Sequence, residues 1–155
     1  MDAAGTTGPR TGTVPLPGRE SARAPVVAES AGAGGQPVAV VDDDDSVRRS
    51  LERLLAAGGI PTVTFASAEE YLAAGAGIDF RCLLLDIHLD GISGLQLAAG
   101  LAARGGAVPI IFLTGSDDEL ATAAIAAGHA SAVLRKPIDV AALRAAITQA
   151  TLASP

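Results

Sequence analysis

Short apolar runs alternate with longer segments in which leucine and alanine recur at helical spacing, from residue 38 almost to the end of the chain. Five such runs predict β-strands: Val38–Val41, Thr62–Phe65, Cys82–Leu85, Ile110–Leu113 and Ala132–Leu134. The third run is apolar at every position, which indicates a strand that is buried on both faces. Strands that alternate with helices in this way predict an α/β domain, with a doubly wound five-stranded parallel sheet covered by five helices.

The helix boundaries follow from capping residues and from glycines. Ser67, Ser93 and Ser116 each stand three residues before a glutamate or glutamine, which is the pattern of a capping box. Gly58-Gly59 and Gly105-Gly106 each follow a helical pattern, as glycines do at helix C-termini. With their capping residues, the predicted helices run from Asp45 to about Ala57, Ser67 to Ala74, Ser93 to about Arg104, Ser116 to about Ala127 and Asp139 to about Thr151.

The first 36 residues differ in composition from the rest of the chain, because they are rich in Gly, Pro, Thr, Ser and Ala and show no periodicity. A segment of this kind cannot bury enough apolar surface to offset the entropy of ordering it. We therefore expect a disordered lead over residues 1–36, or an extension upstream of the true start site. One domain over 37–151 and a short tail over 152–155 follow it, so we expect a domain that stands alone, without an output domain.

Charge and composition exclude several classes of protein. The lead is neutral, so the net charge of −6 belongs entirely to the folded part. An acidic domain with one Tyr, three Phe and no Trp lacks the basic patches and stacking surfaces of nucleic-acid-binding proteins. The chain shows no secretory signal, and no run approaches the roughly 20 apolar residues of a membrane span. We expect a cytoplasmic protein that binds neither nucleic acid nor a membrane, with the sole cysteine, Cys82, as a buried and inert thiol.

Polar residues follow four of the five predicted strands. Asp42 and Asp43 follow the first strand and Asp86 follows the third. Thr114 follows the fourth strand, and Lys136, the only lysine of the chain, follows the fifth. In an open parallel sheet the carboxyl ends of the strands lie along one edge, where ligands bind. Each residue alone can be an ordinary turn or surface residue, but their coincidence at one edge favours a shared site.

The chemistry of these residue types points to phosphoryl transfer. Three crowded carboxylates repel one another unless a cation joins them. Mg²⁺ prefers oxygen ligands and commonly keeps waters and a phosphate oxygen in its shell. A hydroxyl and an ammonium suit the remaining oxygens of a phosphoryl group. In such a site, positioning and charge neutralisation supply most of the catalysis. The neighbouring Asp44 and Asp45 are expected instead to cap the next helix and to favour its dipole.

From about residue 37 to 151, the chain resembles the receiver domain of two-component response regulators. The motifs that carry the resemblance are VVDD at 40–43, SVRR at 46–49, LLLD at 83–86, GISG at 91–94, IFLTG at 111–115 and RKP at 135–137. Their order and spacing along the chain are those of receivers. The resemblance implies a flavodoxin-like fold with strand order 2-1-3-4-5.

The resemblance also implies roles for the acidic residues. Asp86 would accept a phosphoryl group from a phosphohistidine, either of a sensor histidine kinase or of a histidine phosphotransfer protein. Asp42 and Asp43 would hold Mg²⁺, with Asp86 and the backbone carbonyl of His88 as the other protein ligands. The side chain of His88 is not implied as a metal ligand.

For the opposite side of the site, the resemblance implies that Thr114 and Lys136 contact the phosphoryl oxygens. It also implies a cis peptide bond between Lys136 and Pro137. Two positions depart from the family pattern. Val133 stands where an aromatic residue is frequent, so the movement of a large ring together with the threonine is not implied here. Asp90 stands where proline is frequent, which adds a negative charge near the acceptor.

The leading interpretation is a single-domain response regulator that is a signalling switch and not an enzyme, catalysing only its own phosphorylation and dephosphorylation. Charge added at Asp86 would bias the face made by the fourth helix, fifth strand and fifth helix, where we expect a downstream protein or a phosphorelay partner to bind. Two alternatives remain open. One is a receiver-like module that binds without phosphorylation, which Val133 keeps open, although the acidic pair, Thr114 and Lys136 argue against it. The other is an aspartate-nucleophile phosphohydrolase, which needs a second aspartate where this chain has His88.

Overall fold

The computed structural model describes residues 26–27, 35–74, 77–106, 108–115 and 119–153. Its elements are β1 (Val26–Val27), β2 (Val38–Val41), α3 (Asp45–Ala57), β3 (Thr62–Phe65), α4 (Ala68–Ala74), β4 (Cys82–Asp86), α5 (Gly94–Ala103), β5 (Ile110–Thr114), α6 (Glu119–Ala126), β6 (Ala132–Arg135) and α7 (Val140–Ala153). Five of the strands are parallel and neighbour one another in the order β3-β2-β4-β5-β6. This order confirms the predicted fold class and strand order 2-1-3-4-5.

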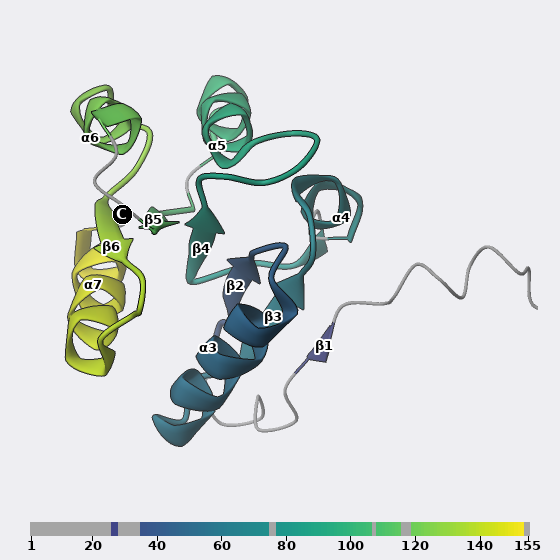
Figure 1. Cartoon of the computed structure of the whole chain (residues 1–155), viewed down its shortest axis with the longest axis vertical. Coiled ribbons are helices and arrows are strands. Elements are labelled where there is room, and N and C mark those ends of the chain that lie inside the picture. The colour runs from purple at the N-terminus through teal and green to yellow at the C-terminus, as the bar shows by residue number, and fades with distance from the viewer. Residues whose placement is uncertain (1–25, 28–34, 75–76, 107, 116–118, 154–155) are drawn as a thin grey trace, which may run out of the picture.

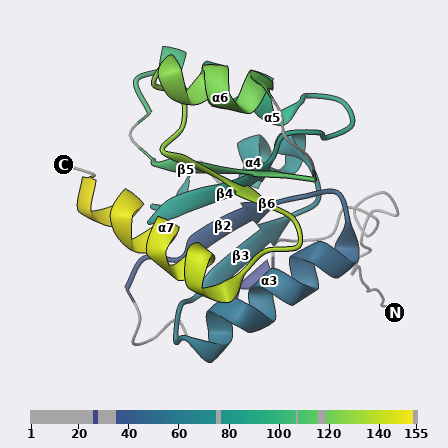
Figure 2. The same cartoon turned by 60° about the vertical axis from the view of Figure 1, so that its left-hand side comes forward.

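Helices cover both faces of the sheet (Figures 1 and 2). Side chains of α3 and α7 pack on one face, and those of α4, α5 and α6 pack on the other. Successive strand residues alternate between the two cores, so Val38 and Val40 face α3 and α7, whereas Ala39 and Val41 face the opposite helices. Strand β4 is buried at every position, as its apolar run predicted. Cys82 is buried, as predicted, and burial raises the pKa of its thiol to about 12. Among the described residues, no helix combines the length and apolar character needed to cross a membrane.

The capping residues position the helices as the sequence predicted, with one variation. The side chain of Asp44 accepts two backbone N–H groups from the first turn of α3. Ser93 and Gln96 form the predicted capping box of α5. At α4, Ser67 Oγ accepts the Glu70 N–H at 3.0 Å, but the Glu70 carboxylate accepts the N–H of the residue before Ser67. The second bond of this box is therefore displaced by one residue.

Three strands continue one residue further than the apolar pattern predicted, to Asp86, Thr114 and Arg135. Asp86 lies opposite Leu113 in the ladder, and Thr114 lies opposite Arg135. The pairing continues because backbone N–H and C=O groups pair whatever the polarity of the side chain. Asp86 and Thr114 are therefore held by the sheet itself and not by loops.

The segment Val26–Val27 pairs antiparallel with β3, although the sequence predicted disorder throughout 1–36. Two β-branched residues can supply backbone partners to the outer edge of a sheet, which would otherwise present unpaired groups. The rest of the lead as far as residue 34, and the predicted capping residue Ser116, lie outside the described residues. Helix α7 runs to Ala153, two residues beyond the predicted end.

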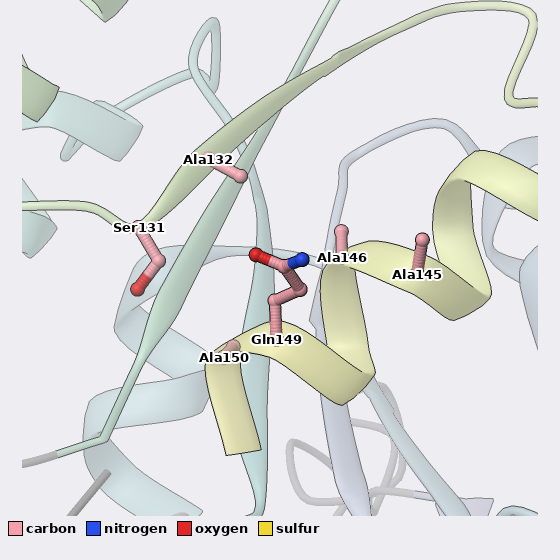
Figure 3. Close-up of a pocket in the computed structure, with 6 residues that line it drawn as sticks. All are labelled: Ser131, Ala132, Ala145, Ala146, Gln149 and Ala150. Atoms are coloured by element: carbon pink, nitrogen blue, oxygen red, sulfur yellow. The ribbon is translucent and has the colours of Figure 1, made fainter. Parts of the chain in front are cut away.

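The other edge strand, β6, lies beside α7. A hollow of about 340 Å³ adjoins both elements (Figure 3). It is lined mostly by small side chains: Ser131, Ala132, Ala145, Ala146, Gln149 and Ala150. Strand β6 is only half-buried at its first three positions. This edge belongs to the face that the sequence predicted to bind a partner.

The first residue of α5, Gly94, lies against the chain that leaves β4. A Cβ atom on Gly94 would overlap the backbone oxygen of Asp86 and lie 2.9 Å from the Ile87 Cα. Because both are backbone atoms, Gly94→Ala should lower the free energy of unfolding by about 2–3 kcal/mol in urea denaturation. Gly100→Ala is the control in the same helix, since nothing lies within 4 Å of its added Cβ. It should be neutral or stabilise by roughly 0.5–1 kcal/mol, and equal losses in the two variants would contradict the packing described.

Candidate functional site

A buried ion pair lies at the centre of the site. Asp42 directly follows β2, and its side chain is fully buried. Lys136 Nζ lies 2.9 Å from Asp42 Oδ2 and 3.5 Å from Asp86 Oδ2. One ammonium therefore bridges two carboxylates that come from neighbouring strands, β2 and β4.

The two carboxylate oxygens of Asp42 have different surroundings. Oδ1 accepts the backbone N–H of Asp44 at 2.9 Å. Oδ2 is in electrostatic contact with Lys136, but it accepts no well-directed hydrogen bond from any of the residues that the structure describes. Buried carboxylate oxygens normally have such partners. Because a carboxylate oxygen has more than one lone pair, Oδ2 can accept a second cation beside Lys136.

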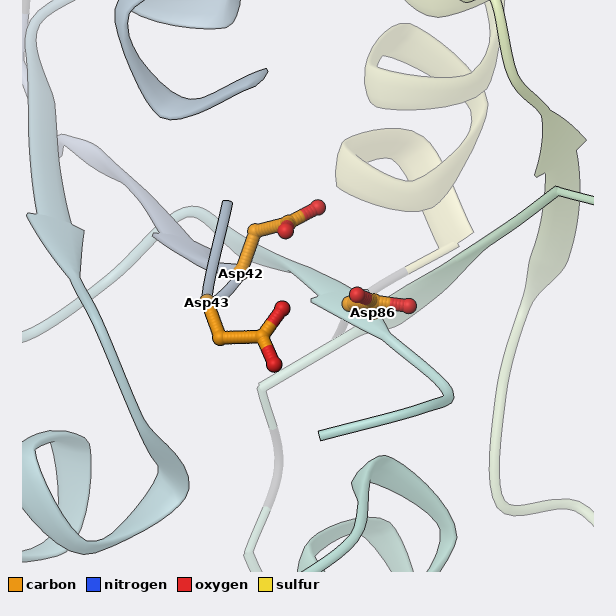
Figure 4. A group of neighbouring side chains, drawn as sticks. All are labelled: Asp42, Asp43 and Asp86. Carbon is orange, nitrogen blue, oxygen red and sulfur yellow. The ribbon is translucent and has the colours of Figure 1, made fainter. Parts of the chain in front are cut away.

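Asp43 completes a group of three carboxylates. Its side chain is exposed, whereas Asp42 and Asp86 are buried. One carboxylate oxygen of each residue lies within 4.8 Å of the corresponding oxygens of the other two (Figure 4). Hard oxygen donors this close together suit a divalent cation such as Mg²⁺. The Oδ2 atom of Asp42, which accepts no well-directed hydrogen bond from the described residues, agrees with that fit.

The electrostatics of Asp86 and Lys136 follow from burial and from their contacts. Burial and the nearby Asp42 charge raise the pKa of Asp86, against the opposing effects of the His88 N–H and of Lys136. The His88 N–H donates to Asp86 Oδ1 at 3.1 Å. Burial by itself would lower the pKa of Lys136, but its contacts with Asp42 and Asp86 outweigh burial and raise it. Lys136 is therefore a cation at neutral pH, beside a carboxylate whose ionisation is unfavourable.

The raised pKa of Asp86 gives a testable pH dependence. In EDTA at pH 7, Asp86→Asn should be more stable than the native chain by about 1 kcal/mol, because the variant removes a crowded charge and keeps the shape. Since the folded state binds this proton more tightly, native stability is lost as pH rises from the unfolded pKa of about 3.9 through the raised folded pKa. Urea denaturation should show the advantage of the variant vanishing below that range. A stability difference between the variant and the native chain that is no larger at pH 7 than at low pH would contradict the assignment.

Thr114 and Lys136 are tied together through the backbone. Thr114 is buried at the end of β5, and its carbonyl accepts the Lys136 N–H at 2.7 Å. The Lys136–Pro137 peptide bond is cis, as expected. The His88 side chain is exposed, at the start of the loop that links β4 to α5. Thr114 and Lys136, which were predicted to contact phosphoryl oxygens, thus lie at the ends of adjacent strands at the same edge of the sheet.

Two residues outside the predicted site contact its loops. Arg48 Nη1 donates to the backbone carbonyl of Asp42 at 2.6 Å. Glu69 Oε2 accepts the backbone N–H of Ile92 at 3.2 Å, in the loop that links β4 to α5. The sequence does mark Arg48 as unusual, because the helix dipole disfavours a cation in the first turn of a helix. A cation at such a position suggests that it has another role. Glu69 has no comparable signal.

Comparisons with known proteins agree with this geometry. Residues 38–148 match the response regulator receiver domain. The transcriptional regulatory protein FixJ of Azorhizobium caulinodans is 44% identical over 112 residues, which cover 72% of this chain and 53% of FixJ. The DNA-binding transcriptional regulator NtrC of Salmonella typhimurium is 40% identical over 101 residues, which cover 65% of this chain and 22% of NtrC.

Among solved structures, the crystal structure of FixJ-N is similar, with a TM-score of 0.71 and 30% sequence identity. The similarity covers 77% of this chain and 96% of that one. The chain spans about half the length of FixJ and a smaller share of NtrC. Phosphorelay signalling and Mg²⁺ binding are general properties of receivers, which act as signalling switches. From residue 38 to 148, the chain therefore belongs to the receiver domain family of two-component response regulators.

Proposed function

We propose that this protein is a phosphorylation switch that accepts a phosphoryl group on Asp86 from a histidine kinase or a histidine phosphotransfer protein. The observation that carries the proposal is the bridging contact of Lys136 with Asp42 and Asp86 at the carboxyl ends of the strands. A phosphoryl acceptor needs a cation that stabilises the negative charge on the carboxylate before transfer and on the phosphoryl oxygens after it. Lys136 lies where it can do both.

The chain's own residues divide the chemistry among them. An Asp86 oxygen attacks phosphorus, so that a P–O bond forms, the P–N bond to the partner's imidazole breaks and the imidazole takes up a proton. The His88 N–H holds the other oxygen and so orients the carboxylate. Lys136 neutralises charge on the phosphoryl oxygens, and the Thr114 hydroxyl orients them by donating a hydrogen bond. The product is an aspartyl phosphate on Asp86.

Asp42, Asp43 and Asp86, with the carbonyl of His88, would hold Mg²⁺. The support for this set is the cluster of three carboxylate oxygens and the buried, unaligned oxygen of Asp42. When bound, the ion neutralises charge on the phosphoryl oxygens and on the acidic cluster. The same residues then make phosphorylation dependent on a divalent cation.

The face made by α6, β6 and α7 is the proposed site of downstream binding. The phosphoryl group carries about −1.5 to −2 charges and replaces the single negative charge of the Asp86 carboxylate, next to Thr114 and Lys136. These two residues lie at the ends of the strands that lead into this face. Leu120 on α6 is 58% exposed, and β6 is half-buried beside the hollow shown in Figure 3. An apolar, partly open face of this kind suits a protein partner.

We further propose that the partner is a protein and not a nucleic acid. The net charge of −6 supports a protein partner. The names of FixJ and NtrC describe regulators of transcription, but the match covers only part of their length. The cytoplasmic location stays a prediction.

Intact mass after incubation with acetyl phosphate tests the proposal. The native chain should gain one phosphoryl group in Mg²⁺ and none in EDTA, and Asp86→Asn should gain none under either condition. Continuous release of phosphate without an adduct would favour the phosphohydrolase. A folded protein with neither adduct nor release would favour the module that binds without phosphorylation.

A further inference from the structure

Arg48 joins the end of β2 to the start of α3. Its Nη1 donates the 2.6 Å hydrogen bond to the Asp42 carbonyl, and its Nη2 lies 2.8 Å from Asp45 Oδ1. The side chain is only 15% exposed, whereas the neighbouring Arg49 side chain is 61% exposed. One arginine is therefore built into the fold, and the other lies on the surface.

The position of Arg48 is electrostatically unfavourable for helix formation. Helix α3 begins at Asp45, so Arg48 lies in its first turn, where the helix dipole disfavours a cation. Its ion pair with Asp45, which is 60% exposed, contributes little. Arg49 makes an equivalent pair with the same carboxylate at 2.9 Å. The bond to Asp42 is what distinguishes Arg48 from Arg49.

That bond acts on the peptide unit between two of the clustered carboxylates. The carbonyl of Asp42 and the N–H of Asp43 belong to one planar group, so a rotation of that group would redirect both side chains. On its other side, the Asp42 N–H donates to the Phe65 carbonyl at 3.2 Å. The backbone of Asp42 is thus held by the sheet at its N–H and by a charged donor at its carbonyl.

We propose that Arg48 is a positioning residue for the divalent cation. Its guanidinium fixes the peptide between Asp42 and Asp43, so that their carboxylates meet that of Asp86 in the arrangement that binds the ion. This inference rests on the function proposed above. Partners that orient metal ligands typically change metal affinity by about 10–100-fold when they are removed.

Charge alone predicts the opposite effect, because removing one cation favours the binding of another nearby. Arg49→Met is the matched control for this term. It removes the same charge from the same turn of α3 and the same kind of contact with Asp45, without touching the Asp42 carbonyl. Methionine keeps a long apolar stem, which preserves the packing of the mostly buried Arg48 side chain.

Calorimetric titration of Mg²⁺ into the full chain tests the proposal, with thermal unfolding in EDTA to establish that each variant is folded. Arg48→Met should weaken the Kd for Mg²⁺ about tenfold, while Arg49→Met leaves it unchanged or slightly tighter. Arg48→Lys, which keeps the charge but cannot make both contacts at once, should fall between Arg48→Met and the native chain.

Equal affinities for Arg48→Met and Arg49→Met would overturn the positioning role and leave the cation site of the native chain intact. If Arg48→Met does not fold, the same comparison between Arg48→Lys and the native chain decides, and equal affinities overturn the role. A native chain that binds no Mg²⁺ would overturn the cation site of the proposed function as well.

Discussion

Replacing Lys136 with methionine is expected to lower the free energy of unfolding by about 3–5 kcal/mol at neutral pH in EDTA. The reason is that Asp42 is fully buried and Lys136 is its counter-charge at 2.9 Å. Without the ammonium, Asp42 and Asp86 also repel each other across neighbouring strands. Urea or guanidinium denaturation of the native and variant chains measures the loss.

Two comparisons make the Lys136 result specific. Arg49→Met removes an exposed cation and should cost less than about 1 kcal/mol. Saturating Mg²⁺ should recover part of the stability of Lys136→Met, by about 2.7 kcal/mol at a hundred times the Kd. If Lys136→Met lowers the free energy of unfolding by less than about 1 kcal/mol in EDTA, Lys136 does not compensate the buried carboxylate of Asp42.

Replacing Asp43 with asparagine is expected to weaken Mg²⁺ binding at least tenfold while changing the free energy of unfolding by less than about 0.5 kcal/mol. Asp43 contributes a carboxylate oxygen to the cluster but is exposed, so the fold does not depend on its charge. Calorimetry and denaturation of the same preparation measure the two effects separately.

Asp90→Asn is the control for Asp43→Asn. Asp90 is also exposed, in the loop after β4, but it does not belong to the carboxylate cluster among the described residues. Its removal should change the Mg²⁺ affinity by no more than about twofold, as expected of a screened surface charge. Similar losses in the two variants would show that only the overall negative charge matters.

The apolar pattern was sufficient to predict the parallel sheet and its helices, because burial on alternating or continuous positions leaves a direct trace in the sequence. It placed the ends of β4 and β5 one residue too early, at the last apolar residue of each run. Side-chain polarity reports burial, whereas strand length depends on backbone pairing, which continues through Asp86 and Thr114. The residues that carry the chemistry were therefore predicted as loop residues, although the sheet holds them.

Other features depend on how segments meet in three dimensions and could not be predicted from the local pattern. The types of the clustered residues indicated a cation site, but not that Lys136 bridges Asp42 and Asp86. The bond from Arg48 to a backbone carbonyl depends on how α3 leaves β2. The pairing of Val26–Val27 with β3 occurs in a segment with no periodicity at all.

The most direct test of the central claim, that Asp86 is the phosphoryl acceptor, is to locate the phosphoryl group on the chain. The full chain is treated with acetyl phosphate and Mg²⁺, reduced with borohydride to convert aspartyl phosphate to homoserine, and mapped by peptide mass spectrometry. We predict conversion of Asp86 alone, and only when Mg²⁺ is present. Conversion of Asp42 or Asp43 instead, or of no residue in a folded chain, would contradict the assignment.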